Sequence, residues 1–166
     1  KFFFNGFKNE SIFFKIILFT SLFFQSIFFI YIPICFECDA ATYYNYAKAF
    51  ILHPGAHVNF DRPPLYPLML LISGTVVPGT FIGILILQFI SGIASVTIFY
   101  KLLNLFSGRF FSFFFSLVFI FSGIPFVYSK LILAEQFYLL SMLITCYFFI
   151  KICLSDKLDS KYLLFF

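Results

Sequence analysis

The residues best suited to chemistry are a few carboxylates and one guanidinium in an otherwise apolar chain. Asp39, Asp61 and Arg62 lie in one polar stretch, residues 37–67, of a chain that is only 11% charged. A carboxylate can take a proton as a general base or bind a divalent cation. The planar, multi-donor head of arginine is suited to phosphate. Glu135, the only acid inside a later apolar run, could join them.

The composition indicates that the elements positioning these residues are embedded in lipid. Hydrophobic residues make up 62% of the 166 residues, and 31 residues are Phe. A soluble domain of this size has about half its residues apolar and about a quarter charged. The net charge of +4 does not indicate nucleic-acid binding, because the basic residues are scattered at the ends of apolar segments, where membrane topology explains them.

The apolar segments predict an all-α integral membrane protein with four membrane-spanning helices. A crossing helix needs about 20 apolar residues, and four segments are long enough: 12–34, 80–100, 110–128 and 131–150. Between the first two lies an outer loop, residues 35–79. Its apolar part, 65–77, is short and interrupted at its end by Gly74, Pro78 and Gly79, so we expect a short interfacial or re-entrant helix there.

The outer loop also predicts a helix lying along the membrane surface. Asp39 can cap this helix, and Asp39, Tyr43, Tyr46 and Phe50 share one face of it. We expect Tyr43, Tyr46 and Tyr66 to anchor at the interface, with stacking on sugar or lipid as the alternative. In the Ser-Phe run 110–115, we expect small residues at helix contacts and Phe side chains facing lipid.

The distribution of Lys and Arg predicts the orientation. With a cytoplasmic N-terminus and four crossings, the residues on the inside are Lys1, Lys8, Lys15, Lys101, Arg109, Lys151, Lys157 and Lys161, against Lys48, Arg62 and Lys130 on the outside. This agrees with the positive-inside rule. A fifth crossing over 65–77 would move the basic turn 101–109 to the outside, so we disfavour it.

Two runs in the chain carry a resemblance to a known family in the order and spacing of their residues. The first is Asp39-x-x-x-Tyr43-x-x-x-Ala47 followed by Asp61-Arg62-Pro63-Pro64-Leu65-Tyr66-Pro67, and the second is Lys130-Leu131-Ile132-Leu133-Ala134-Glu135-Gln136-Phe137-Tyr138. Together they resemble the first outer loop and the start of the fourth crossing of GT-C glycosyltransferases. The similarity is to the bacterial family-39-like enzymes related to protein O-mannosyltransferases and to the aminoarabinose transferase of lipid A.

The resemblance implies an enzyme that moves a sugar from a polyprenyl-phosphate-linked donor to a lipid, glycan or protein acceptor. It implies a multi-pass protein of a bacterial inner (plasma) membrane, with its active site facing outward. Asp39 matches the general base and Glu135 a second outer acid. The candidate substrate-binding residues are Asp61, Arg62, Tyr43 and Lys130. A divalent metal is left open, with Asp61 as its candidate ligand.

Single displacement with one carboxylate base implies inversion at the anomeric carbon. Because the chain starts with Lys1 and ends in an apolar run, we expect it to be the N-terminal part of a longer GT-C domain, inactive alone.

Each of these residues also has a simpler interpretation. Asp39 could only cap its helix, and Arg62 could bind lipid headgroups. Asp61 could pair with Arg62, and Glu135 with Lys130. For the whole chain, the alternatives are a transporter, which should show inverted repeats and broken helices, and a structural membrane subunit without catalysis.

Two further spacings are only weak signals, the first for a disulfide or metal site and the second for a metal site. Cys35 and Cys38 form a single CxxC, and His53, His57 and Asp61 are separated by Pro54-Gly55, which breaks any helix carrying all three.

Overall fold

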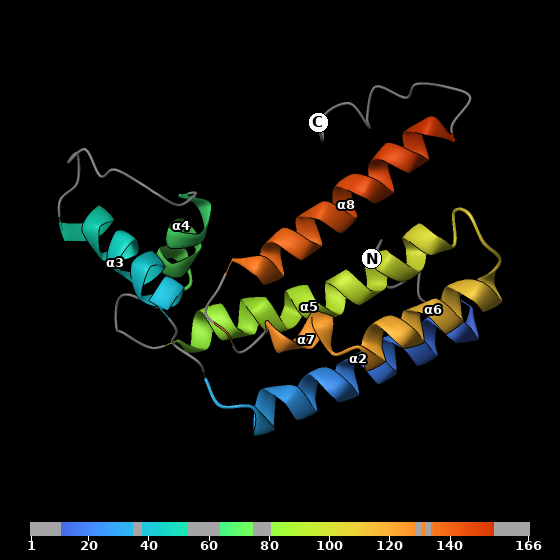
Figure 1. Ribbon diagram of the computed structural model, residues 1–166, viewed down its shortest axis with the longest axis horizontal. Coiled ribbons are helices and arrows are strands. Elements are labelled where there is room, and N and C mark those ends of the chain that lie inside the picture. The colour runs from blue at the N-terminus through green and yellow to red at the C-terminus, as the bar shows by residue number, and fades with distance from the viewer. Residues whose placement is uncertain are drawn as a thin grey trace, which may run out of the picture.

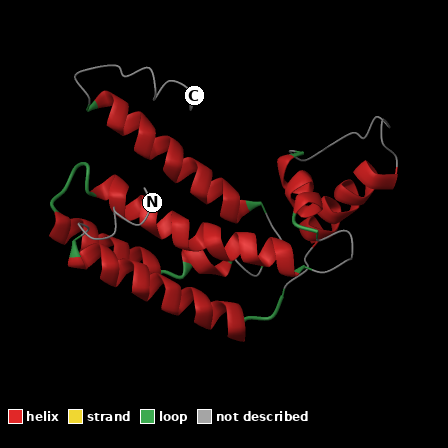
Figure 2. Cartoon of the chain, turned by 180° about the vertical axis from the view of Figure 1, so that it is seen from behind, coloured by secondary structure: helices red, strands yellow, loops and turns green. Residues whose placement is uncertain are grey.

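The computed structural model describes residues 11–34, 38–52, 64–74, 81–128, 131 and 134–154. The elements found there are all α-helices, as the sequence predicts (Figures 1 and 2). They are α2 (Ile12–Tyr31), α3 (Cys38–Leu52), α4 (Leu65–Ile72), α5 (Ile82–Leu103), α6 (Arg109–Phe121), α7 (Ile124–Val127) and α8 (Glu135–Cys153).

Three of the described helices are long and apolar enough to cross a membrane. They are α2, α5 and α8, with 20, 22 and 19 residues. At 1.5 Å per residue each spans about 30 Å, the thickness of the hydrocarbon core. Each overlaps most of one segment that the sequence predicts to span the membrane: 12–34, 80–100 and 131–150. α2 stops at Tyr31, two residues before Pro33, which cannot donate a backbone hydrogen bond.

The run predicted to cross over residues 110–128 consists of two helices. α6 has 13 residues and alone spans only about 20 Å. The chain then turns at Gly123, which has a φ of +74°, and continues as the four-residue helix α7. This left-handed conformation suits glycine because it has no Cβ to clash.

The helix directions follow from contacts between their ends. Ser11, just before α2, hydrogen-bonds to Tyr100 near the end of α5, with the hydroxyl oxygens 3.1 Å apart. Phe29, near the end of α2, packs on Phe89 near the start of α5. The two helices are therefore antiparallel, which agrees with the expectation that residues 65–77 do not cross between them. α6 runs parallel to α2, since Phe113 packs on Phe13 and Phe121 on Phe24.

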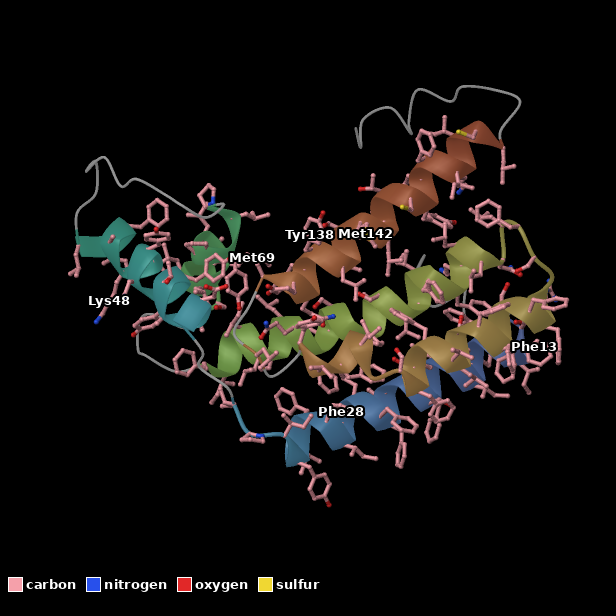
Figure 3. All side chains as sticks on the ribbon, viewed as in Figure 1. Phe13, Phe28, Lys48, Met69, Tyr138 and Met142 are labelled. Atoms are coloured by element: carbon pink, nitrogen blue, oxygen red, sulfur yellow. The ribbon has the colours of Figure 1, made fainter. Side chains whose placement is uncertain are left out.

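The distribution of side chains differs from that of a soluble protein, because several polar residues are buried while many large apolar residues are exposed. The buried polar residues of the described helices are Ser21, Gln25, Gln88, Ser91, Ser95, Ser112, Ser116 and Gln136. Large apolar residues cover the outside, and aromatic rings project outward along α2 and α6 (Figure 3). In α6, Ser112 and Ser116 are fully buried while Phe114 and Phe115 are exposed. This confirms the prediction that small residues mediate helix contacts, and lipid is the solvent that such a surface suits.

The described residues form two apolar clusters. One joins α2, α5, α6 and α7 and consists of Phe14, Ile17, Val96, Tyr100, Ile120 and Phe126. The other joins α3 and α4 to the start of α5 and consists of Ala40, Tyr43, Ala47, Tyr66, Leu70 and Ile84. α3 and α4 therefore lie side by side at the end of the bundle where α5 begins (Figure 1).

Candidate functional site

Asp39, a residue of the polar stretch 37–67, lies in the first turn of α3. The helix starts at Cys38, so Asp39 is its second residue and not the N-cap that the sequence predicts. The helix therefore begins two residues before the predicted start, at Cys38 instead of residue 40, because the ends of a helix depend on small local energies. The carboxylate, which is half-buried, is favoured there by the positive end of the helix dipole.

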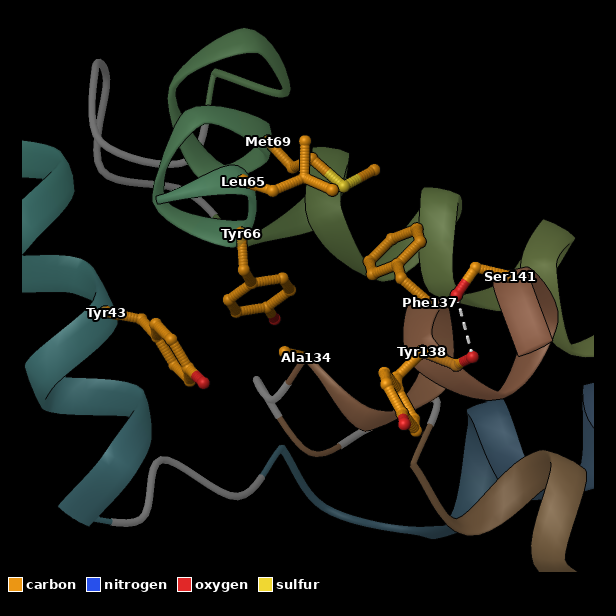
Figure 4. A pocket seen from close by; sticks show the side chains of 8 residues that line it. All are labelled: Tyr43, Leu65, Tyr66, Met69, Ala134, Phe137, Tyr138 and Ser141. Carbon is orange, nitrogen blue, oxygen red and sulfur yellow. Dashed lines mark hydrogen bonds between the residues drawn. The ribbon is translucent and has the colours of Figure 1, made fainter. Parts of the chain in front are cut away.

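One turn further along α3, Tyr43 contacts Tyr66 of α4. The ring centroids are 4.9 Å apart and the rings are edge to face, at 74° (Figure 4). Both side chains are buried, with exposures of 6% and 3%. They form part of a packed cluster and are not displayed on the surface as the interfacial anchors that the sequence predicts. The contact joins the segment that contains Asp39 and Tyr43 to the proline-rich segment that contains Tyr66, the two parts of the first run named above.

The position of Tyr66 depends on the prolines around it. Pro64 immediately precedes α4, and Pro67 is its third residue. Proline is tolerated in the first turn of a helix because the N–H groups there have no partner within the helix. The proline-rich run thus starts a short helix that directs Tyr66 inward, while Leu65 beside it is 67% exposed.

Gln88 of α5 connects Tyr66 to the segment that precedes α8. Its amide nitrogen donates to the Leu131 carbonyl at 2.7 Å and to the Tyr66 hydroxyl at 3.4 Å. Phe137 of α8 also packs on Tyr66, with ring centroids 5.9 Å apart. Residues from α3, α4, α5 and α8 therefore meet around one phenol.

Glu135, the first residue of α8, is exposed and acts on this phenol through its charge. Burial raises the pKa of Tyr66 strongly, and the charge of Glu135 and the neighbouring Tyr43 raise it further. Tyr66 therefore stays protonated at neutral pH and keeps a hydroxyl proton to donate.

A pocket of about 180 Å³ opens beside this phenol (Figure 4). It is lined by Tyr43, Leu65, Tyr66, Met69, Ala134, Phe137, Tyr138 and Ser141. The Ser141 hydroxyl donates to the Tyr138 carbonyl at 2.9 Å and so is already engaged. These residues offer a mostly apolar wall with tyrosine hydroxyls and carry no acidic or basic side chain. Such a pocket suits an apolar chain or a ring with a few hydroxyls.

The two candidate catalytic acids flank this pocket in the chain. Asp39 precedes the lining residue Tyr43 by one helical turn, and Glu135 directly follows the lining residue Ala134. The predicted substrate-binding residues Asp61, Arg62 and Lys130 lie outside the described residues, so their approach to Asp39 stays a prediction. The same holds for Asp61 as a metal ligand and for the Cys35–Cys38 pair. Within the described part of the chain, no group of three or more His, Cys, Asp or Glu side chains could hold a metal ion.

Gln88 and Phe137 are site residues that the sequence interpretation missed. Gln88 is a polar residue inside a 22-residue apolar helix, and polar side chains in such helices face partners or cavities. That signal marks the residue but does not identify its partners, which lie 22 and 43 positions away.

The chain was also compared with known proteins. No family model, no characterised protein and no solved structure matches it.

Proposed function

We propose that this chain forms the membrane-embedded part of a transferase that takes a sugar from a polyprenyl-phosphate-linked donor. The observation that carries the proposal is the contact of Tyr43 with Tyr66. It packs the helix of Asp39 against the helix that follows Asp61-Arg62-Pro63-Pro64 directly in the chain. The start of α8, with Glu135, adjoins the same cluster through Phe137.

The proposed membrane arrangement has four crossings, made by α2, α5, α6 with α7, and α8. It is supported by the charges of the described helices. Lys15, Lys101 and Arg109 lie at one end of the bundle, by the directions of α2, α5 and α6 given above. Lys151 lies near the end of α8, which runs in the same general direction as α5 (Figure 1). Asp39 lies on α3 at the opposite end, and Glu135 is the first residue of α8. We assign the basic end to the cytoplasm of a bacterial cell and the acidic end, with α3 and α4, to the outer face.

In the proposed reaction, Asp39 takes the proton of an acceptor hydroxyl while that oxygen bonds to the anomeric carbon. The bond from this carbon to the donor phosphate breaks, and the phosphate oxygen keeps the electron pair. A single displacement of this kind inverts the anomeric carbon. Arg62 would stabilise the negative charge that grows on the departing phosphate. The apolar pocket beside Tyr66 would accept the first part of the lipid carrier.

The experiment uses the full-length protein in proteoliposomes with a polyprenyl-phosphate-linked sugar as donor. Asp39→Asn should reduce transfer by roughly 100- to 10,000-fold, because the amide cannot take the proton. Asn45→Ala, an exposed position on the same helix, is the matched control and should retain transfer. Normal transfer by Asp39→Asn would remove Asp39 as the base.

A transporter is the second candidate function, and one observation favours it. The break between α6 and α7, with buried glutamines beside it, is a pattern that carriers use for solute sites. Solute uptake by proteoliposomes that lack any lipid-linked sugar would favour this candidate over the transferase.

A further inference from the structure

All three glutamines of the chain are fully buried, one on each long helix: Gln25 on α2, Gln88 on α5 and Gln136 on α8. A primary amide inside a lipid-facing bundle is unfavourable unless its donors and acceptor find partners. Gln88 belongs to the site described above. Gln25 and Gln136 lie beside Gly92, one turn further along α5 than Gln88, where α7 packs against α5. The proposed reaction does not use them.

Gln136 has two well-defined partners. Its amide nitrogen donates to the Pro125 carbonyl of α7 at 3.2 Å, and its amide oxygen accepts from the Gly92 N–H of α5 at 3.1 Å. The opposite orientation of the amide would place its oxygen against an acceptor and its nitrogen against a donor. Gln136 therefore ties the first turn of α8 to both neighbours.

Gln25 approaches the same place from α2. A Cβ added to Gly92 would meet the Gln25 Oε1 at 2.8 Å, its Nε2 at 3.1 Å and the Pro125 carbonyl oxygen at 2.9 Å. The amide of Gln25 and the carbonyl of Pro125 thus share the notch that glycine leaves on α5. Neither polar atom of the Gln25 side chain has a hydrogen-bond partner among the described residues.

The Pro125 carbonyl has room for a second donor. A carbonyl oxygen has two lone pairs, and Gln136 occupies one. α7 is only four residues long, so its carbonyl oxygens find few N–H donors within the helix. Lipid supplies no donor either. The Gln25 amide nitrogen and the Pro125 carbonyl oxygen lie 3.1 Å and 2.9 Å from the same point, the position of a Cβ on Gly92. Gln25 is therefore the nearby side chain that could supply this second donor.

We propose that Gln25 and Gln136 both donate to the Pro125 carbonyl over the Gly92 notch, as an interhelical amide clamp. The clamp joins α2, α7 and α8 at the Pro125 carbonyl oxygen, and the Gly92 N–H ties α5 to it through the Gln136 amide oxygen. Because Gln136 directly follows Glu135, the clamp also fixes the start of α8; that Glu135 is thereby positioned for catalysis rests on the proposed function. Gln25 and Gln136 are positioning residues and do not contact substrate.

The direct test is a distance measurement by solid-state NMR on the unmutated chain in lipid bilayers. The glutamine side chains carry ¹⁵N and the prolines carry ¹³C at the carbonyl. Both the Gln25 and the Gln136 nitrogens should show dipolar dephasing that corresponds to about 4 Å from a carbonyl carbon, as in an N–H···O=C bond. Single Gln→Met variants assign the three signals.

The control is Pro125→Ala, which keeps the carbonyl but removes its label, so the dephasing of both nitrogens should vanish. Dephasing of Gln136 alone, or of neither, would overturn the clamp. This result does not depend on any transferase activity, so it separates failure of the clamp from failure of the proposed function.

The positioning role is tested by the distance between spin labels on Asn45→Cys in α3 and Met142→Cys in α8, in a background without other cysteines. Both sites are exposed. The unmutated clamp should give one narrow distance distribution, and Gln25→Met should broaden it at least twofold. Phe19→Met, at a 72% exposed position on the same helix, should leave the distribution unchanged. An unchanged distribution in Gln25→Met would overturn the positioning role.

Discussion

Tyr43 and Tyr66 meet edge to face at 4.9 Å, although 22 residues separate them in the chain. Edge-to-face packing sets the positive edge of one ring against the negative face of the other. The contact links a helix that contains an acid to a proline-rich run, and it lies beside the pocket. The cluster around it is therefore the natural place to probe both the stability and the chemistry of the site.

The first prediction concerns the coupling of the two rings. Tyr43→Ala or Tyr66→Ala should each destabilise the protein by roughly 3 kcal/mol or more, because a buried aromatic side chain is lost. The double variant should be less destabilised than the sum of the single variants, by about 1 kcal/mol. The measurement is reversible unfolding in mixed micelles. As a control, Tyr43→Phe keeps the ring, so its free energy of unfolding should stay within about 1 kcal/mol of that of the original protein. Strictly additive losses in the double variant would mean that the contact contributes nothing to stability.

A second prediction follows from the raised pKa of Tyr66. Burial, then Glu135, then Tyr43 raise this pKa above the ordinary value of 10.0. A folded-state pKa above the unfolded value stabilises the fold fully below pH 10 and loses this contribution as the pH rises further. The absorbance of tyrosinate should therefore show one phenol, that of Tyr66, that still carries its proton well above pH 10.

The assignment of this phenol comes from variants. Tyr66→Phe should remove the late-titrating group, and Glu135→Gln should lower its pKa, because a negative charge that opposes ionisation is gone. Ionisation of every tyrosine together near pH 10 would contradict the buried setting of Tyr66.

A matched pair of glycines provides the third prediction. Gly123 has a φ of +74°, whereas Gly108 has a φ of −61° and no atom within 4 Å of an added Cβ. Gly123→Ala should destabilise the protein by about 1–2 kcal/mol, because an L residue is strained in the left-handed region. Gly108 is the N-cap of α6, where alanine is less favourable than glycine but not strained, so Gly108→Ala should cost less, about 0.5 kcal/mol. Equal effects in reversible unfolding would show that the turn between α6 and α7 does not need the left-handed conformation.

The parts of this structure that the sequence predicts are those with a local physical cause. Ser112 and Ser116 recur at helical spacing among Phe residues, so their burial follows from periodicity alone. The predicted start of α3 is two residues late, because a helix end depends on small energy differences. Gln88 is visible in the sequence as a polar residue in an apolar helix. Its bonds to Tyr66 and Leu131 depend on how distant segments pack, and a single sequence does not contain that information.

The last prediction tests the orientation of the bundle. In a background without other cysteines, Asn45→Cys on α3 and Asp61→Cys should react with a membrane-impermeant maleimide from the outside only. Ser107→Cys, in the turn between α5 and α6, should react only after the cytoplasmic side is opened. The reason is that α2 and α5 are antiparallel, so the segment between them and the turn after α5 must lie at opposite ends. Labelling of positions 45 and 107 from the same side would contradict the membrane arrangement. If position 45 reacted only from the cytoplasm and position 107 only from the outside, the fold would stand but Asp39 would lie on the cytoplasmic side. That result would contradict a transferase site that faces outward.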